Sequence, residues 1–496
     1  MSCDDVEMLS PPRGTAYLAG RRGRRTGLSV TATLVTVPVL WLDATLRVVE
    51  AQPTSPAARR PTQASPAAKP SDVMLVAMTP NGLPAGNYPL VGAGVPGQGV
   101  LEAARRQAPL TFETLASEDR LVALGDCWDG LVRAMPRPSP FLLHCWVVEW
   151  WRHYGEGSSL AVEVAFRGNE LVGALPLITF PHRGLRIGTF VGARQSALAD
   201  ALIAEGEGDE LVEALVDRVI ASEHDYVDLF GLSAEGRLAS LKGPRNLQLF
   251  QRNEAPVLDL SDGWEAAYRR RTNSRKRAHY KRCRRLLAEH GRVEVVVART
   301  LEQHEAALEE AFRLHELRWR GRPDGSGFGT ETGRRFTRSV MPGLVEIDAS
   351  RVVMIKIDGR AVAFSWNLLL EGHVFLHRLA FDPAYGRGSP GIVNALNSLE
   401  FAAGEGAVKA EFLGGAERFK RELSDGLEPL HLGLGLPGSA KGRAAVVARS
   451  TWLRARRRGK GSALAQKAYY GTASARRRVM RRRDVLRPSG VQRVGD

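Results

Sequence analysis

Cysteine is scarce in this 496-residue chain, and metal-type histidine patterns are missing from it. The four cysteines, Cys3, Cys127, Cys145 and Cys283, have no metal-type spacing. So few thiols in so long a chain argue against a disulfide-built scaffold. None of the 11 histidines forms a ligand-spaced pair beside a carboxylate, which is the pattern that zinc sites use. The sequence therefore predicts no metal.

Long hydrophobic runs are also missing. The apolar run at residues 28–42 follows a cluster of arginines and superficially resembles a signal peptide. It is interrupted by Ser, Thr and Pro and is too short for a membrane span. Residues 51–70 are mostly Ala, Pro, Ser, Thr, Gln and Arg, a composition that buries too little apolar surface to order itself. We therefore expect residues 1–108 to be disordered.

Positive charge is concentrated at one end. The formal net charge is +15, and residues 441–496 hold 17 Lys or Arg against two acidic residues, so the rest of the chain is neutral. Such a block is typical of a solvated extension that attracts anions without specificity. We expect residues 438–496 to form a basic tail that contacts anionic membrane or a polyanion, peripheral to the inner face of the membrane. Its few aromatic residues do not favour specific nucleic-acid recognition.

A glycine-rich segment at residues 386–391 is the most informative part of the chain. It follows the strand-forming residues 373–381 and precedes apolar residues at helical spacing that begin at Ile392. Ser389 lies at the predicted N-cap, and Pro390 lies at the first helical position, where its fixed φ suits a helix. The pattern predicts that a helix begins at Pro390.

This segment also predicts an anion site. Glycines let a ligand approach the backbone, free amides at Gly391 and Ile392 point out of the helix end, and the helix dipole adds roughly half a positive charge there. A pyrophosphate is the expected guest, and an ordinary turn is the alternative. The candidate coenzyme-binding residues are Gly386, Arg387, Gly388, Ser389, Gly391 and Ile392.

The surrounding pattern predicts an antiparallel meander. Residues 352–357 and 361–370 are strand-like and flank Asp358-Gly359, a strong hairpin signal. After the glycine-rich segment and its helix, residues 408–413 again form a strand-like run. This order resembles the coenzyme-binding half of the GNAT acyltransferases.

Short motifs follow one another along the chain: the basic run 274–291, Asp382-Pro383, Ser389-Pro390-Gly391, residues 412–415 and residues 417–420. This ordered set resembles the GNAT proteins grouped with the cellulose-biosynthesis protein CelD, which are relatives of the Fem peptidoglycan aminoacyltransferases. The family commonly has Tyr-Lys where this chain has Phe419-Lys420, so a phenolic proton donor is missing at 419. The resemblance covers roughly residues 110–435. Because such enzymes use cytosolic acyl-coenzyme A, it also implies a cytoplasmic protein, with export of the chain as the alternative.

The resemblance implies acetyl-coenzyme A, or another acyl-coenzyme A, as co-substrate and attack of an amine on its thioester. Glu417 and His377 are the candidate bases, and Lys420 matches the family's motif lysine as a residue that binds substrate carboxylate or coenzyme phosphate. The alternatives are a sheet histidine at 377 and a solvated helix around Glu417. Trp366 and Trp319 are candidates for the walls of an acceptor pocket.

The fold expected is α/β, with two tandem GNAT-like domains whose mixed, largely antiparallel sheets are flanked by helices. Residues 109–252 contain an echo of the second half but lack its glycine-rich loop, so we place the coenzyme in residues 253–437. Residues 269–285 contain ten Lys or Arg and no acid, and as a helix they turn Tyr280, Cys283 and Leu287 to one face. This helix either lines a groove for anions or is a cationic surface helix.

Three functions follow. The first is transfer of an acyl group from acyl-coenzyme A to a small-molecule amine or amino-sugar acceptor, in envelope or exopolysaccharide biosynthesis. The second is a Fem-like transfer from charged tRNA, with the basic residues as its footprint. The third is a non-catalytic envelope-assembly protein. The sequence shows no sustained heptads for the helical arm typical of Fem proteins, which favours the first.

Overall fold

The structure is a computed structural model that describes residues 108–193, 195–319, 327–415 and 417–460. All of these residues belong to one compact unit. Two predictions fall largely outside the described residues. They are the disordered region, of which residues 1–107 are not described, and the basic tail, of which residues 461–496 are not described. None of the described helices combines the length and the apolar character that a membrane span requires.

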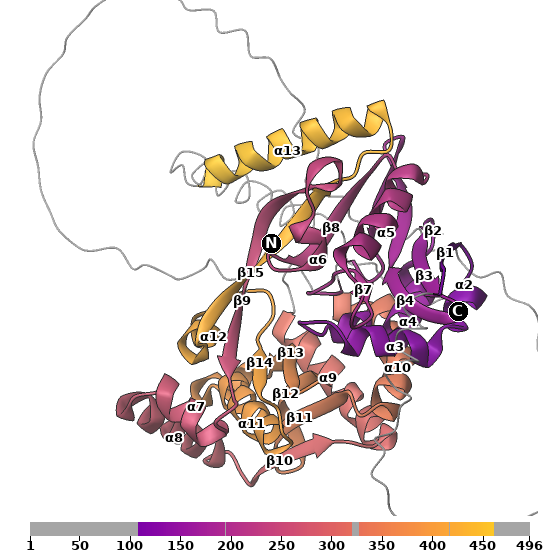
Figure 1. The fold of residues 1–496 in the computed structure, drawn as a ribbon. Coiled ribbons are helices and arrows are strands. Elements are labelled where there is room, and N and C mark those ends of the chain that lie inside the picture. The colour runs from indigo at the N-terminus through magenta and orange to yellow at the C-terminus, as the bar shows by residue number, and fades with distance from the viewer. Residues whose placement is uncertain (1–107, 194, 320–326, 416, 461–496) are drawn as a thin grey trace, which may run out of the picture. The chain divides into compact units, whose positions relative to one another are not determined.

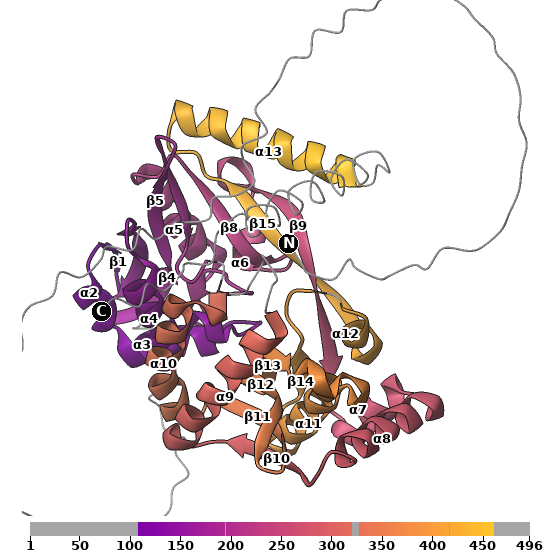
Figure 2. The same ribbon diagram turned by 180° about the vertical axis from the view of Figure 1, so that it is seen from behind.

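Two halves of the chain repeat one order of elements: a strand, helices, an antiparallel meander, a helix, a strand, a short helix and a final strand (Figures 1 and 2). The first half contains β1 (Leu110–Leu115), α2 (Glu118–Val122), α3 (Gly125–Arg133), η1 (Pro140–Leu142), α4 (His144–Tyr154), β2 (Ser159–Leu160), β3 (Val162–Arg167), β4 (Glu170–Leu175), β5 (Leu177–His182), β6 (Leu185–Phe190), β7 (Leu202–Ile203), α5 (Asp209–Ala221), β8 (Tyr226–Ser233), α6 (Arg237–Ser240), η2 (Gly243–Arg245) and β9 (Leu247–Asp259).

The second half has the same repeat from β10 to β15, with a pair of helices before it and a long helix after it. It contains α7 (Trp264–Arg271), α8 (Ser274–Ala288), β10 (Val293–Ala298), α9 (Leu301–Trp319), η3 (Gly327–Gly329), α10 (Glu331–Glu346), β11 (Ser350–Ile357), β12 (Arg360–Leu370), β13 (His373–Phe381), η4 (Pro383–Gly388), α11 (Pro390–Gly404), β14 (Lys409–Glu411), α12 (Arg418–Leu423), β15 (Gly426–Gly435) and α13 (Ala440–Lys460). The predicted α/β fold, with tandem halves and largely antiparallel sheets flanked by helices, is confirmed.

One sheet runs through both halves. Eleven strands follow the order β10-β11-β12-β13-β14-β9-β15-β8-β6-β5-β2, and a smaller sheet has the order β1-β3-β4-β7. In each half, the last strand of the meander pairs in parallel with the strand after the helix, β6 with β8 and β13 with β14. The other ladders in the described residues are antiparallel.

The final strands of the two halves are exchanged. β9 closes the first half in sequence but pairs with β14 of the second, and β15 closes the second half but pairs with β8 of the first. β9 and β15 also pair with each other along nearly their whole lengths. The boundary predicted between residues 252 and 253 therefore lies inside β9, at the seam of this exchange.

The predicted hairpin turn is confirmed. Asp358 and Gly359 both have positive φ, 49° and 79°, and connect β11 to β12. Two consecutive residues in the left-handed region are what a type I′ turn requires, which is why Asp-Gly is a strong signal for it. Glu371 and Gly372 form the same kind of two-residue turn between β12 and β13, with φ of 46° and 71°.

β13 contains a β-bulge. Trp366 of β12 pairs with Arg378, but the next residue, Asn367, pairs with Leu376, so His377 is the extra residue. A bulge resets the alternation of side chains along a strand. His377 and Leu379 therefore lie on opposite faces of β13, although their spacing of two along a strand-like run predicts a shared face. The ring of His377 lies beside Trp146 and Trp366, whereas Leu379 packs toward the start of α11.

Helix α13 corrects the expectation of a tail that is separate from residue 438 on. Val446 and Leu453 are only 6% exposed each and pack with Leu432, Leu434 and other side chains of β15, β8 and β6. Figure 1 shows α13 crossing β15 and β8. The cause is a narrow stripe of apolar side chains on α13 that packs on the sheet. The many cations around this stripe make it hard to recognise in the sequence.

Candidate functional site

The segment after β13 is a 3-10 helix and not an open loop. Asp382 caps it by accepting the Ala384 N–H at 3.0 Å. Ser389 follows in the left-handed region with φ of 45°, and α11 begins at Pro390 as the sequence predicts. The Ser389 side chain makes no capping hydrogen bond, so the turn is closed by backbone bonds.

Two of the three glycines are required by packing within the protein. A Cβ at Gly388 would lie 2.6 Å from the Leu287 side chain of α8, and one at Gly391 would lie 2.8 Å from the Phe381 ring. Gly386 is exposed, and a Cβ there would meet nothing within 4 Å. The expectation that a ligand explains Gly388 and Gly391 is therefore corrected: neighbouring side chains already fill that space.

The amides at the start of α11 differ in availability. The Ile392 N–H donates to the Ser389 carbonyl at 3.1 Å, so the expected free amide at Ile392 is wrong. The Gly391 N–H has no acceptor within the described residues. Arg387 is exposed beside it. One amide, one guanidinium and the positive end of the α11 dipole are thus available to an anion.

β13 and β14 pair briefly and then separate. Their parallel ladder runs only from His373 opposite Lys409 to Phe375 opposite Glu411. The chain after β14 then turns away, because the Phe412 N–H donates to Pro256 at 3.0 Å. Along Leu376–Phe381 the far edge of β13 therefore has no partner strand within the described part of the chain. Such an edge can pair with an extended ligand through main-chain groups.

Helix α8 packs against η4, the 3-10 helix that follows β13. Its N-cap, Asn273, accepts the Lys276 N–H at 2.9 Å. The predicted inward face is confirmed, because Tyr280, Cys283 and Leu287 are all buried. The opposite side exposes cations that form no ion pair within the described residues: Arg275, Lys281, Arg282 and Arg285.

His377 stands in an aromatic cage. Its ring centroid lies 5.4 Å from Trp146 and 5.0 Å from Trp366, both edge-on, and 5.3 Å from Phe141. Burial, together with the neighbouring Arg378 charge, holds the pKa of His377 well below its usual value of 6.5. The imidazole is therefore neutral near pH 7 and has a lone pair available to accept a proton.

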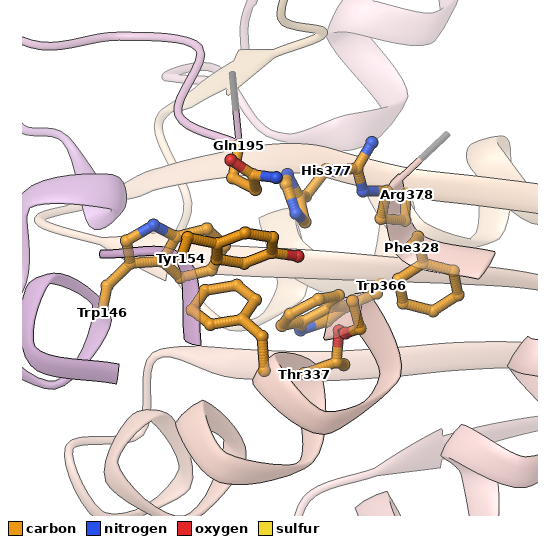
Figure 3. A pocket seen from close by; sticks show the side chains of 10 residues that line it. Trp146, Tyr154, Gln195, Phe328, Thr337, Trp366, His377 and Arg378 are labelled. Atoms are coloured by element: carbon orange, nitrogen blue, oxygen red, sulfur yellow. The ribbon is translucent and has the colours of Figure 1, made fainter. Parts of the chain in front are cut away.

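A small pocket lies on the same face of β13 (Figure 3). It offers about 10 Å³ to the centre of a water-sized molecule, which is room for about one water. The first half contributes Trp146 and Tyr154 from α4, and the second contributes strand residues, so both halves build it. The lining residues are Trp146, Tyr154, Gln195, Phe328, Gly333, Phe336, Thr337, Trp366, His377 and Arg378.

The sequence did not identify Arg378 as a site residue. Neighbours on a regular strand point to opposite faces, yet Arg378 and His377 line one pocket because the bulge places them together. Trp366, a candidate wall, does line it, whereas Trp319 is not among the lining residues. Trp146 comes from the distant first half, and no sequence spacing connects it to β13.

Glu417 and Lys420 lie elsewhere. Lys420 Nζ and Glu417 Oε2 are 2.9 Å apart across the first turn of α12, a local ion pair. Helix α12 packs mainly on α7 and β9. No described contact connects either side chain to His377, so the three predicted catalytic residues are not in contact, and their roles remain a prediction.

No group of three His, Cys, Asp or Glu side chains within the described ranges is arranged to hold a metal ion.

Part of the chain matches a known protein family. Residues 274–421, from α8 into α12, match the family model of the acetyltransferase (GNAT) domain. This segment is about 30% of the chain. No curated protein sequence matches at a significant level.

Several solved structures resemble this chain at low sequence identity and low TM-score. A C-terminal DUF2156 domain from Agrobacterium fabrum, from a protein provisionally named a lysylphosphatidylglycerol synthetase, is 14% identical with a TM-score of 0.44, covering 68% of this chain and 97% of that one. FemX is 12% identical with a TM-score of 0.44, covering 64% and 96%. A tandem GNAT protein from the clavulanic acid pathway is 15% identical with a TM-score of 0.34, covering 66% and 97%. At these values none of the three says what this chain does.

Proposed function

We propose that this protein is an N-acyltransferase that moves an acyl group, most simply acetyl, from acyl-coenzyme A to an amine. The observation that carries the proposal is the separation of β13 from β14 beside the start of α11, inside the segment that matches the GNAT domain. An open strand edge that ends at a helix N-terminus suits a long ligand with amide groups in its middle and phosphates at one end.

The residues present fit such a ligand. The Gly391 N–H and the exposed Arg387 are placed to hold phosphate oxygens. The unpaired edge of β13 over Leu376–Phe381 is placed to hold an extended amide-bearing arm. The cations of α8 supply a positive field beside the same turn. When bound, acyl-coenzyme A supplies a thioester carbonyl to the amine.

The reaction needs one proton acceptor near the amine. As the new N–C bond forms, the C–S bond breaks, and the proton taken from the amine is passed on to the leaving thiolate sulfur. In our proposal His377 accepts the amine proton at an imidazole nitrogen, because its low pKa keeps it neutral and the bulge turns it into the pocket. The aromatic cage excludes water around it. Glu417 remains the second candidate base, and Lys420 its ion-pair partner.

The acceptor in this proposal is a small amine or an amino sugar. Resemblance to the CelD-like group supports a place in envelope or exopolysaccharide biosynthesis, on the cytoplasmic side of the membrane. The cationic residues beyond α13 would then bring the protein to anionic lipid or polymer.

A second donor class has one observation in its favour. The unpaired cations Arg275, Lys281, Arg282 and Arg285 make one exposed face of α8, which suits the backbone of a charged tRNA in a Fem-like transfer. The same face suits coenzyme phosphates, so the donor must be distinguished by binding.

Calorimetric titration of the full-length chain with acetyl-coenzyme A tests the proposal. We expect saturable binding that weakens about tenfold in Arg387→Ala, since a charge-assisted phosphate contact contributes on the order of 1.5–3 kcal/mol. Arg360→Ala, at an exposed strand end of the β11–β12 hairpin, is the control and should bind as the parent does. A flat titration at millimolar coenzyme, with saturable binding of aminoacyl-tRNA, would replace the first donor by the second.

A further inference from the structure

The pocket between the two halves contains hydrogen-bond donors without acceptors. Arg378 Nε and Trp146 Nε1 are both buried and have no partner within the described structure. Both groups can only donate. Buried polar groups nearly always have a partner, so these two donors are exceptions.

Arg378 also lacks a counterion. Burial lowers the pKa of its guanidinium, and the opposing influence comes from the Tyr154 phenol and from no carboxylate. Isolated buried cations are strongly unfavourable, and proteins pair them or use them. Arg378 nonetheless keeps part of its surface accessible, so an anion that enters the pocket can reach it.

The walls restrict what that anion can be. Apart from Arg378, the lining is aromatic or neutral, and the depressed pKa of His377 means that it adds no charge. The pocket therefore presents a single positive charge. The free space is about that of one water, which admits one oxygen of a singly charged carboxylate while the rest of the ligand lies toward the opening. A phosphate is bulkier and carries more than one negative charge near pH 7.

We propose that this pocket binds the carboxylate of the acceptor, so that the acceptor is an amine that also carries a carboxylate, as an amino acid does. This assignment rests on the proposed function. The carboxylate accepts from Arg378 Nε. Because His377 and Arg378 are neighbours on the bulge and line the same pocket, a carboxylate held by Arg378 brings a nearby amine to the imidazole.

Binding of a small carboxylate to the full-length chain tests the pocket directly. The probe is trifluoroacetate, followed by its fluorine NMR line width, with neutral trifluoroacetamide of the same size as the reference. We expect saturable broadening for trifluoroacetate alone. Arg378→Met should weaken binding at least tenfold.

Arg338→Met is the matched control. It removes the same charge from an exposed site on α10, where Arg338 pairs with Glu309 at 2.7 Å, and it should leave the probe affinity unchanged. Arg378→Met should also melt at or above the parent temperature, because it removes a buried charge that has no partner. A structural arginine would behave in the opposite way, so a large drop in melting temperature for Arg378→Met would overturn the proposal.

Equal broadening in the parent and in Arg378→Met, or equal broadening by the amide, would also overturn it. Acetyl-coenzyme A is titrated into the same preparations. If the coenzyme binds and the carboxylate does not, the pocket assignment fails and the proposed function stands. If the carboxylate binds and the coenzyme does not, the pocket is an anion site but its assignment to an acceptor is overturned. With both bound, glycine should be acetylated at lower KM than glycinamide, and Arg378→Met should remove that difference.

Discussion

At the scale of single residues, the β-bulge at His377 determines which side chains of β13 line the pocket. Without the bulge, His377 and Arg378 would point to opposite faces of the sheet. With it, both line one pocket, and burial beside a cation keeps the imidazole neutral. The sequence named His377 but supplied no reason to pair it with its neighbour.

Replacement of His377 by Gln tests its role as the base. Activity of the native protein, expressed per concentration of neutral amine, should stay level from pH 7.5 down to pH 6, because a pKa far below 6.5 leaves His377 unprotonated over that range. His377→Gln should lower kcat about 10²-fold or more, the usual contribution of a positioned base. A native profile that falls with an apparent pKa near 6.5 would show that another, unperturbed group is the base.

At the scale of elements, helix α13 shows how composition can mislead. Its cations predicted a solvated tail, yet one stripe of apolar side chains packs it on β15 and β8. Arg449 adds an ion pair to Asp228 at 3.2 Å. A charge count averages over all faces of a helix, whereas burial depends on one face only.

Two adjacent valines make this testable. Val446 is 6% exposed and Val447 is 63% exposed. Val446→Asp should lower the free energy of unfolding by roughly 2–4 kcal/mol, since it buries an unpaired carboxylate in an apolar contact. Val447→Asp should change it by less than about 0.5 kcal/mol. The measurement is urea unfolding of both variants. Equal, small effects on the free energy of unfolding would show that α13 does not pack on the sheet.

At the scale of the whole molecule, exchange of the final strands joins the halves into one sheet. An ion-pair cluster lies across the same region. Arg137 of the first half binds Glu411 of β14 with two hydrogen bonds, of 3.0 and 2.6 Å, and Glu411 is fully buried. Lys409 lies 3.4 Å from the same carboxylate. The halves are thus expected to unfold together.

Arg137→Ala should destabilise the molecule by roughly 3 kcal/mol, at the lower end of the cost of breaking a buried pair, because Lys409 still faces Glu411. The control is Arg133→Ala, which removes an exposed pair to Glu371, also between the halves. It should cost less than about 1 kcal/mol. Differential scanning calorimetry should show one transition in each case. Two separated transitions in the native protein would mean that the halves are independent domains.

The sequence by itself determined what depends on neighbours along the chain. It predicted the helix start at Pro390, the Asp358-Gly359 turn, the buried face of α8 and the repeated order of elements, because capping, turn chemistry and periodicity are local. Only the tertiary structure decided the rest. The His377 bulge, the exchange of β9 and β15, the docking of α13 and the meeting of Trp146 with Arg378 join residues far apart in the chain, and such contacts are selected by packing, for which no local spacing is a signal.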